Sequence, residues 1–111
     1  MNGSDIQNVD AAGLRKLYRS DQTARLVLDS FAARYNSARL TTVSSLMSLL
    51  TGAGFVVTRP DIIRVFKALQ SLNCGDYIQG NVRGDRNKQS RFVWKVYIAG
   101  VGKIATDTKQ R

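Results

Sequence analysis

The chain has 111 residues, enough for a single domain, and 43% of them are hydrophobic, enough for one core. Its net charge of +9 indicates an anionic partner, such as nucleic acid, an anionic membrane surface or an acidic protein. The chain has no His, all eight acids are Asp, and Cys74 is the one cysteine. The commonest catalytic base and the usual zinc ligands are therefore missing, and we expect neither an enzyme nor a cofactor or metal site.

Residues 1–9 are polar and are expected to be a disordered lead-in, without the basic start and apolar core of a signal peptide. The longest apolar-leaning stretch, residues 45–57, is too short and too polar to cross a bilayer, which needs about 20 residues. A single unpaired cysteine fits a reducing compartment better than secretion. We therefore expect a cytoplasmic or nucleoid-associated protein that does not contact membranes.

Two helices are expected in the first third of the chain. Asp10 is a candidate N-cap for a short helix that runs to about Arg19, and Ser20 or Asp21 is the candidate N-cap for the next helix. The stretch 22–35 has a helical repeat of apolar residues, which predicts an amphipathic helix. That repeat consists of Ala24, Val27, Leu28, Phe31 and Tyr35.

Two more helices are expected after a brief extended piece at 38–40. Thr41 or Thr42 can cap the first, which Gly52-Ala53-Gly54 ends. Thr58 can cap the second, over residues 59–73, and Pro60 suits its first turn. The expected buried residues are Val43, Leu46, Leu49 and Leu50 in the first helix and Ile62, Val65, Phe66, Leu69 and Leu72 in the second. On the second, Arg64, Lys67, Ala68 and Ser71 then point outward.

The apolar pattern next changes to a period of two, which predicts strands at 77–82 and 92–98, with Trp94 in the core. The connector between them, residues 83–91, has four basic residues and one acid, so we expect a hairpin with a long basic tip. Residues 10–102 then form one domain, and residues 103–111 are expected to be a flexible basic tail.

This order of elements resembles the winged-helix family of helix-turn-helix DNA-binding domains over residues 21–98. Two passages carry the resemblance: residues 41–72, where Thr58-Arg59-Pro60 opens the last helix, and residues 74–94, where a strand and the basic connector follow. The resemblance implies an α+β winged helix, with a three-helix core, a C-terminal β-hairpin wing and a short extra N-terminal helix. The link 52–58 is longer than the tight turn of the simplest helix-turn-helix proteins.

The resemblance also implies that the helix at 59–73 enters the major groove and that the wing lies along the backbone or minor groove. Residues 59–103 hold nine Lys and Arg against three Asp, so +6 of the net charge of +9 lies in this half. We expect Arg64 to read bases and the wing cations to bind phosphates. The residues assigned to nucleic acid are Arg59, Arg64, Lys67, Ser71, Arg83, Arg86, Lys88 and Arg91.

The sequence thus predicts a double-stranded DNA-binding protein, a small regulator of transcription or of a mobile element. Two alternatives stay open: a protein-interaction module that docks on an acidic partner, and an RNA-binding domain. A homodimer is a further option, because helix-turn-helix proteins often pair to read palindromes. The first helix would be its contact surface, through Leu14, Leu17 and Tyr18.

Overall fold

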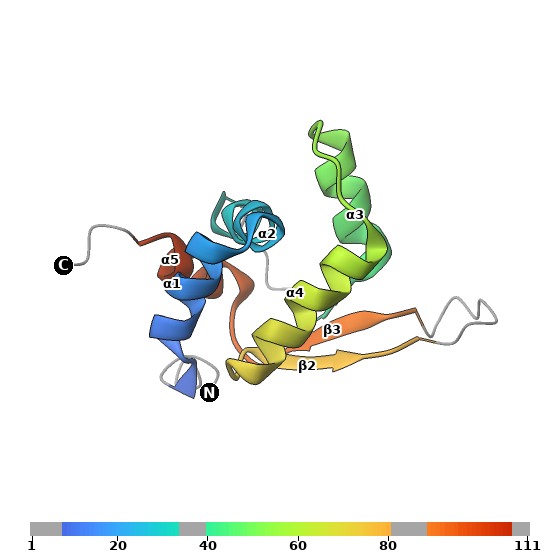
Figure 1. Cartoon of the computed structure of the whole chain (residues 1–111). Helices are drawn as coiled ribbons and strands as arrows, with labels where there is room; N and C mark the ends of the chain where they lie inside the picture. The colour runs from blue at the N-terminus through green and yellow to red at the C-terminus, as the bar shows by residue number, and fades with distance from the viewer. Residues whose placement is uncertain (1–7, 34–39, 81–88, 108–111) are drawn as a thin grey trace.

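The computed structural model describes residues 8–33, 40–80 and 89–107. These residues form an α+β fold, which confirms the predicted class, with five helices and a three-stranded antiparallel sheet (Figure 1). The helices are α1 (Ala11–Ser20), α2 (Gln22–Ala33), α3 (Val43–Gly52), α4 (Arg59–Ser71) and α5 (Ile98–Thr106). The strands are β1 (Leu40–Thr42), β2 (Gly75–Ile78) and β3 (Arg91–Trp94).

The first four helices begin at polar side chains, as the sequence predicted. In each case the capping oxygen accepts a hydrogen bond from the amide three residues further on, which satisfies one of the unpaired donors of the first turn. Of the open alternatives, Asp21 rather than Ser20 and Thr42 rather than Thr41 serve this purpose. The four capping residues are Asp10, Asp21, Thr42 and Thr58.

The core is built around the inner face of α4. Its Ile62, Val65, Phe66 and Leu69 are fully buried, as predicted from their spacing. The ring of Phe66 stacks on Phe92 of β3 with centroids 5.2 Å apart. Trp94 continues this row of rings to Phe31 of α2 and is itself only 8% exposed, so its predicted core position is confirmed. Aromatic packing therefore joins α4, β3 and α2.

In the sheet, β3 lies between β1 and β2. Phe92 is opposite both Thr41 of β1 and Tyr77 of β2. The strand predicted at 92–98 ends at Trp94, although Val96 and Ile98 are buried as their alternation suggested. The chain leaves the sheet there and enters α5, so these two side chains reach the core from a bend and a helix.

The prediction of a flexible tail from residue 103 onward is wrong for residues 103–106, which belong to α5. Ile98, Val101, Gly102 and Ala105 are buried at helical spacing, and α5 lies beside α1 and α2 (Figure 1). Gly100 and Gly102 have low helix propensity, and this concealed the helical spacing of the apolar residues. Gly102 is needed for packing, because it brings α5 against the backbone of α2 at Ala32. Residues 108–111 of the predicted tail lie outside the described residues.

The predicted lead-in 1–9 is also wrong at its end. Val9 is only 8% exposed and packs in the core. The amide of Asp10 donates to the carbonyl of Leu72 over 3.0 Å, and the side-chain amide of Asn73 donates to the carbonyl of Asn8 over 3.1 Å. The start of α1 is therefore attached to the end of α4. Residues 1–7 lie outside the described residues.

Replacing Gly102 with Ala tests the contact between α5 and α2. A Cβ atom there would meet the amide nitrogen of Ala32 and lie 2.8 Å from its Cα. Because backbone cannot rotate out of the way, we expect Gly102→Ala to lower the free energy of unfolding by about 1–3 kcal/mol in urea titrations.

The matched control is Gly52→Ala, at the end of α3, where the added Cβ would have no atom within 4 Å. This variant should keep its stability or gain up to about 1 kcal/mol from helix propensity. If the two variants proved equally stable, the close approach of α5 to α2 would be wrong.

Candidate nucleic-acid interface

The outer face of α4 is the best candidate for an interface. With its apolar stripe buried, Arg59, Arg64, Lys67 and Ser71 are exposed, as the sequence predicted, whereas Ala68 is half-buried. Arg59 begins the helix, behind a capping box formed by Thr58 and Asp61. Helix α4 thus carries three exposed cationic side chains, and their partners determine which of them can meet a ligand.

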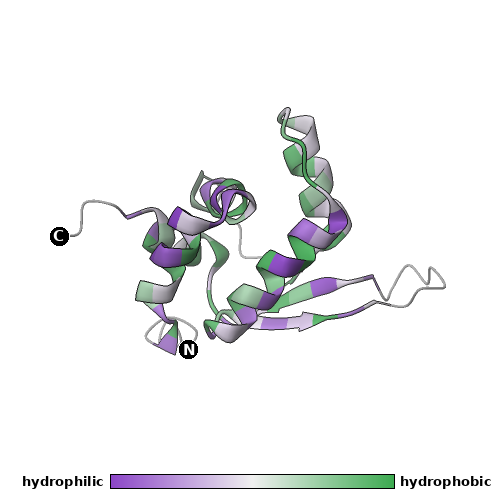
Figure 2. Ribbon diagram, in the orientation of Figure 1, coloured by the Kyte–Doolittle hydropathy of each residue, from purple (hydrophilic) through white to green (hydrophobic). Residues whose placement is uncertain are grey.

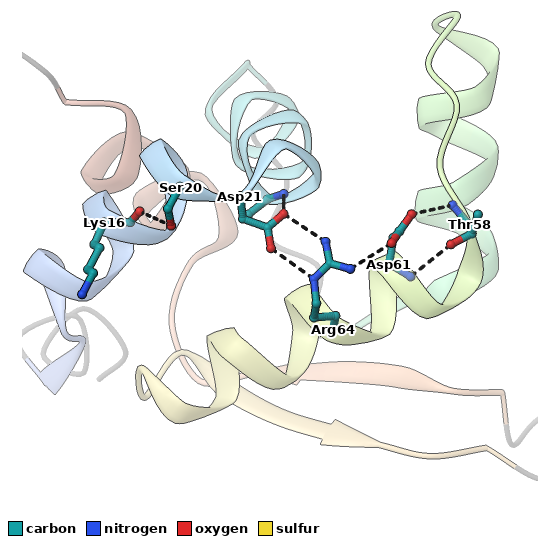
Figure 3. Close-up of polar contacts among 7 residues, drawn as sticks. Lys16, Ser20, Asp21, Thr58, Asp61 and Arg64 are labelled. Carbon is teal, nitrogen blue, oxygen red and sulfur yellow. Dashed lines mark hydrogen bonds and ion pairs between the residues drawn. The ribbon is translucent and has the colours of Figure 1, made fainter.

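Arg64 has partners within the chain that the sequence did not predict. Its Nε and Nη2 donate to the two carboxylate oxygens of Asp21, each over 3.1 Å, and its Nη1 donates to Asp61 over 2.9 Å (Figure 3). We refer to Asp21, Asp61 and Arg64 as the arginine clamp. The clamp ties α4 to the corner between α1 and α2, because Asp21 both follows α1 and caps α2.

The clamp changes the electrostatics of α4. The hydrogen bond from Arg64 is the main cause that lowers the pKa of Asp21, opposed in part by burial. Hydrogen bonds from Arg64 and from Thr58 lower the pKa of Asp61, and the two carboxylates raise the pKa of Arg64. The charge of Arg64 is therefore balanced by two anions, although its side chain is 52% exposed.

Arg59 and Lys67 have different surroundings. Arg59 donates from Nη1 to the hydroxyl of Ser44 over 3.2 Å, which places it beside the first turn of α3. The ammonium group of Lys67 lies 5.9 Å from the ring centroid of Tyr77, near the limit of a cation–π contact. Within the described residues neither cation forms a salt bridge. They are thus cations of α4 whose charge is not neutralised by a carboxylate of the described chain.

Of the remaining predicted contacts, Ser71 lies on this face and Arg91 does not. In β3, Arg91 lies on the opposite face of the sheet from its neighbour Phe92, which packs on α4. The Nη1 of Arg91 donates to the carbonyl of Gln89 over 2.9 Å. Ser71 donates its hydroxyl proton to the carbonyl of Ala68 over 2.8 Å. The wing residues Arg83, Arg86 and Lys88 lie outside the described residues.

A second polar cluster fixes the α1–α2 corner. Arg25 donates to the carbonyls of Tyr18 and Arg19, in the last turn of α1, over 3.3 Å and 3.2 Å. The phenol of Tyr18 donates to Asp29 over 2.7 Å, and this hydrogen bond, with burial, raises the pKa of Tyr18. Arg25 is thus committed to the corner that holds Asp21, and the corner in turn supports the arginine clamp.

Other site classes find little support in the described part of the chain. Cys74 is fully buried, and burial, followed by the charge of Asp10, raises the pKa of its thiol to about 12, so it is an unreactive apolar residue. The described residues hold no group of acids and cysteines that could bind a metal ion. None of the helices described is both long and apolar enough to span a bilayer.

Comparison with known proteins returned no match to a family model, to a curated protein or to a solved structure.

Replacing Asp21 with Asn tests the arginine clamp, because Asn keeps the N-cap acceptor of α2 and removes the charge. A carboxyl whose pKa is lower in the folded chain stabilises the fold above its unfolded pKa, about 4, and loses that effect as pH falls through the folded value. The stability of the native chain should therefore fall between about pH 5 and about pH 2. In Asp21→Asn we expect a shallower fall, and a loss of about 0.5–1 kcal/mol at pH 7, since the pair is partly exposed.

The control for this variant is Asp76→Asn, which removes an ion pair to Lys95 with 3.9 Å between charged atoms and both side chains more than half exposed. When the free energy of unfolding is measured in urea at several pH values, its slope with pH should be the same for this control as for the native chain. Identical slopes for the native chain and Asp21→Asn would contradict the clamp.

Proposed function

We propose that this chain is a winged-helix protein that binds double-stranded DNA, with the outer face of α4 in the major groove and the connector 83–91 as its wing. The observation that carries the proposal is the pair of cations on α4, Arg59 and Lys67, whose charge no described carboxylate neutralises. Both side chains are exposed, Arg59 at the start of α4 and Lys67 in its middle. A surface of this kind suits the phosphates and base edges of a duplex.

The topology supports the same proposal. Helices α3 and α4 are followed at once by the β2–β3 hairpin, and β1 pairs with β3 on its other side. In Figure 1 α4 lies across the β2–β3 hairpin. The basic residues of 83–91 thus follow directly from the element that α4 packs on.

The contacts of α4 indicate which of its residues would bind the duplex and which would hold the helix in place. Lys67 and Ser71 would meet the duplex from the middle and end of the helix, and Arg59 would contact a phosphate from its start. Arg64 would have to give up a bidentate pair with Asp21 in order to read a base. We therefore assign Arg64 the role of holding α4 in place. Recognition would then depend more on phosphates than on bases, with limited selectivity between sequences.

The biological role proposed is that of a small regulator of transcription or of a mobile element. The chain has no histidine, and its one cysteine is a buried thiol whose pKa is raised to about 12. Such a protein would act by occupying its site, where it competes with other machinery or helps to recruit it.

Binding to duplex DNA, duplex RNA and single strands, measured by fluorescence anisotropy at several salt concentrations, tests the proposal. If about four phosphates are contacted, log K on duplex DNA should fall with log salt at a slope of about −3.6. Absence of DNA affinity even at low salt would contradict the proposal. Tighter binding to duplex RNA would favour an RNA-binding domain, and binding to an acidic protein alone would favour an interaction module.

Alanine variants test the assignment of residues on duplex DNA. Lys67→Ala and the triple variant at Arg83, Arg86 and Lys88 should each weaken binding and reduce the salt slope, by about one contact for Lys67. Lys103→Ala removes the same charge from an exposed position of α5 and is the control, with little expected change. Equal losses for Lys67→Ala and Lys103→Ala would show that only net charge matters, and not the face of α4.

A further inference from the structure

The connection between α3 and α4 presents apolar side chains to solvent. Val56 is 95% exposed, more than any other large hydrophobic side chain among the described residues. Phe55, next to it in sequence, is 43% exposed, and Leu49, in the last turn of α3, is 36% exposed. Figure 2 shows this segment in green next to α3, which lacks the strongly hydrophilic residues of the other helices. We refer to Leu49, Phe55 and Val56 as the apolar tip.

The apolar tip belongs to an ordered segment. The amide of Ala53 donates to the carbonyls of Leu49 and Leu50, and the amide of Phe55 donates to Leu50 over 3.0 Å. Gly54 adopts the left-handed conformation that this turn requires, with φ of 97°. Val57, which follows Val56, is buried and anchors the end of the segment. Val56 is therefore held outward by its neighbours, so a partner would meet a surface that needs little ordering.

Charge indicates what kind of partner the apolar tip fits. Residues 40–58 contain no charged residue, in a chain with 25 charged residues and a net charge of +9. The nearest described charge along the chain, Arg59, contacts Ser44 in the first turn of α3, at the end opposite the tip. Figure 1 shows α3 projecting away from α1, α2, α5 and the hairpin.

We propose that the apolar tip is a self-association surface, through which two copies of this chain contact each other. Two copies that carry +9 each repel through their other faces. Helix α3, with 10 residues, is about 15 Å long, so a tip-to-tip contact keeps the charged bodies further apart than the Debye length of about 8–10 Å. Symmetry then pairs the same apolar side chains with one another.

The surface predicted for a dimer from the sequence does not serve this purpose as well. Leu14 is fully buried, and Leu17 and Tyr18 pack partly against the core of their own chain. The apolar tip is small, so the association should be weak, with a Kd on the order of 100 µM. It should persist or strengthen as salt is raised, because it depends on apolar burial and not on charge.

Sedimentation equilibrium of the full chain, without nucleic acid, tests this proposal with Val56→Lys as the variant. The average mass of the native chain should rise with concentration up to about 1 mM, at both about 50 mM and about 500 mM NaCl. Val56→Lys should weaken association at least about tenfold, because it places like charges at the contact. Its circular dichroism should match the native chain, since Val56 is 95% exposed.

The matched control is Ile78→Lys, at a position of β2 that is 38% exposed, which should leave association unchanged. The proposal is overturned if the native chain stays monomeric or if raised salt dissociates the two copies. It is equally overturned if Ile78→Lys weakens association as much as Val56→Lys does. It is also overturned, in favour of a lipid surface, if a monomeric chain binds phosphatidylcholine vesicles through Val56. Because no DNA is present, these outcomes do not depend on the proposed function.

Discussion

Helix α4 contributes four fully buried side chains to the core, and the positions of the other elements follow from this packing. Phe66 stacks on Phe92 and so holds the sheet against one side of α4. On another side the arginine clamp joins α4 to the α1–α2 corner. Both contacts leave Arg59 and Lys67 exposed, and these two cations are the basis of the proposed function.

The two kinds of contact contribute differently. Burial of four large apolar side chains stabilises the fold by several kcal/mol, at about 1.5–3 kcal/mol for each. The arginine clamp is partly exposed, so its contribution to stability is small by comparison. Its importance lies in orientation, because a bidentate pair fixes the angle between α4 and the α1–α2 corner. It also removes one cation, Arg64, from those that a nucleic acid would meet.

The sequence predicted features that depend on local patterns. Apolar spacing gave the buried face of α4, and capping residues such as Asp10 and Thr58 located the starts of helices. Contacts between distant segments could not be predicted, because 43 positions separate Asp21 from Arg64 and nothing local links them. Helix α5 was missed since Gly102, which its packing requires, has low helix propensity. Arg64 is paired with two carboxylates, whereas Lys67 forms no salt bridge within the described residues, and this contrast appeared only in the fold.

The central claim is that a duplex lies against the outer face of α4. Titration of isotope-labelled protein with duplex DNA, followed by backbone amide chemical shifts, tests it most directly. We predict that the largest changes in chemical shift occur at Arg59, Lys67, Ser71 and residues 83–91, while the amide chemical shifts of α5 and of the apolar tip stay unchanged. Shifts concentrated on α1, α2 or α5, with α4 unaffected, would contradict this account.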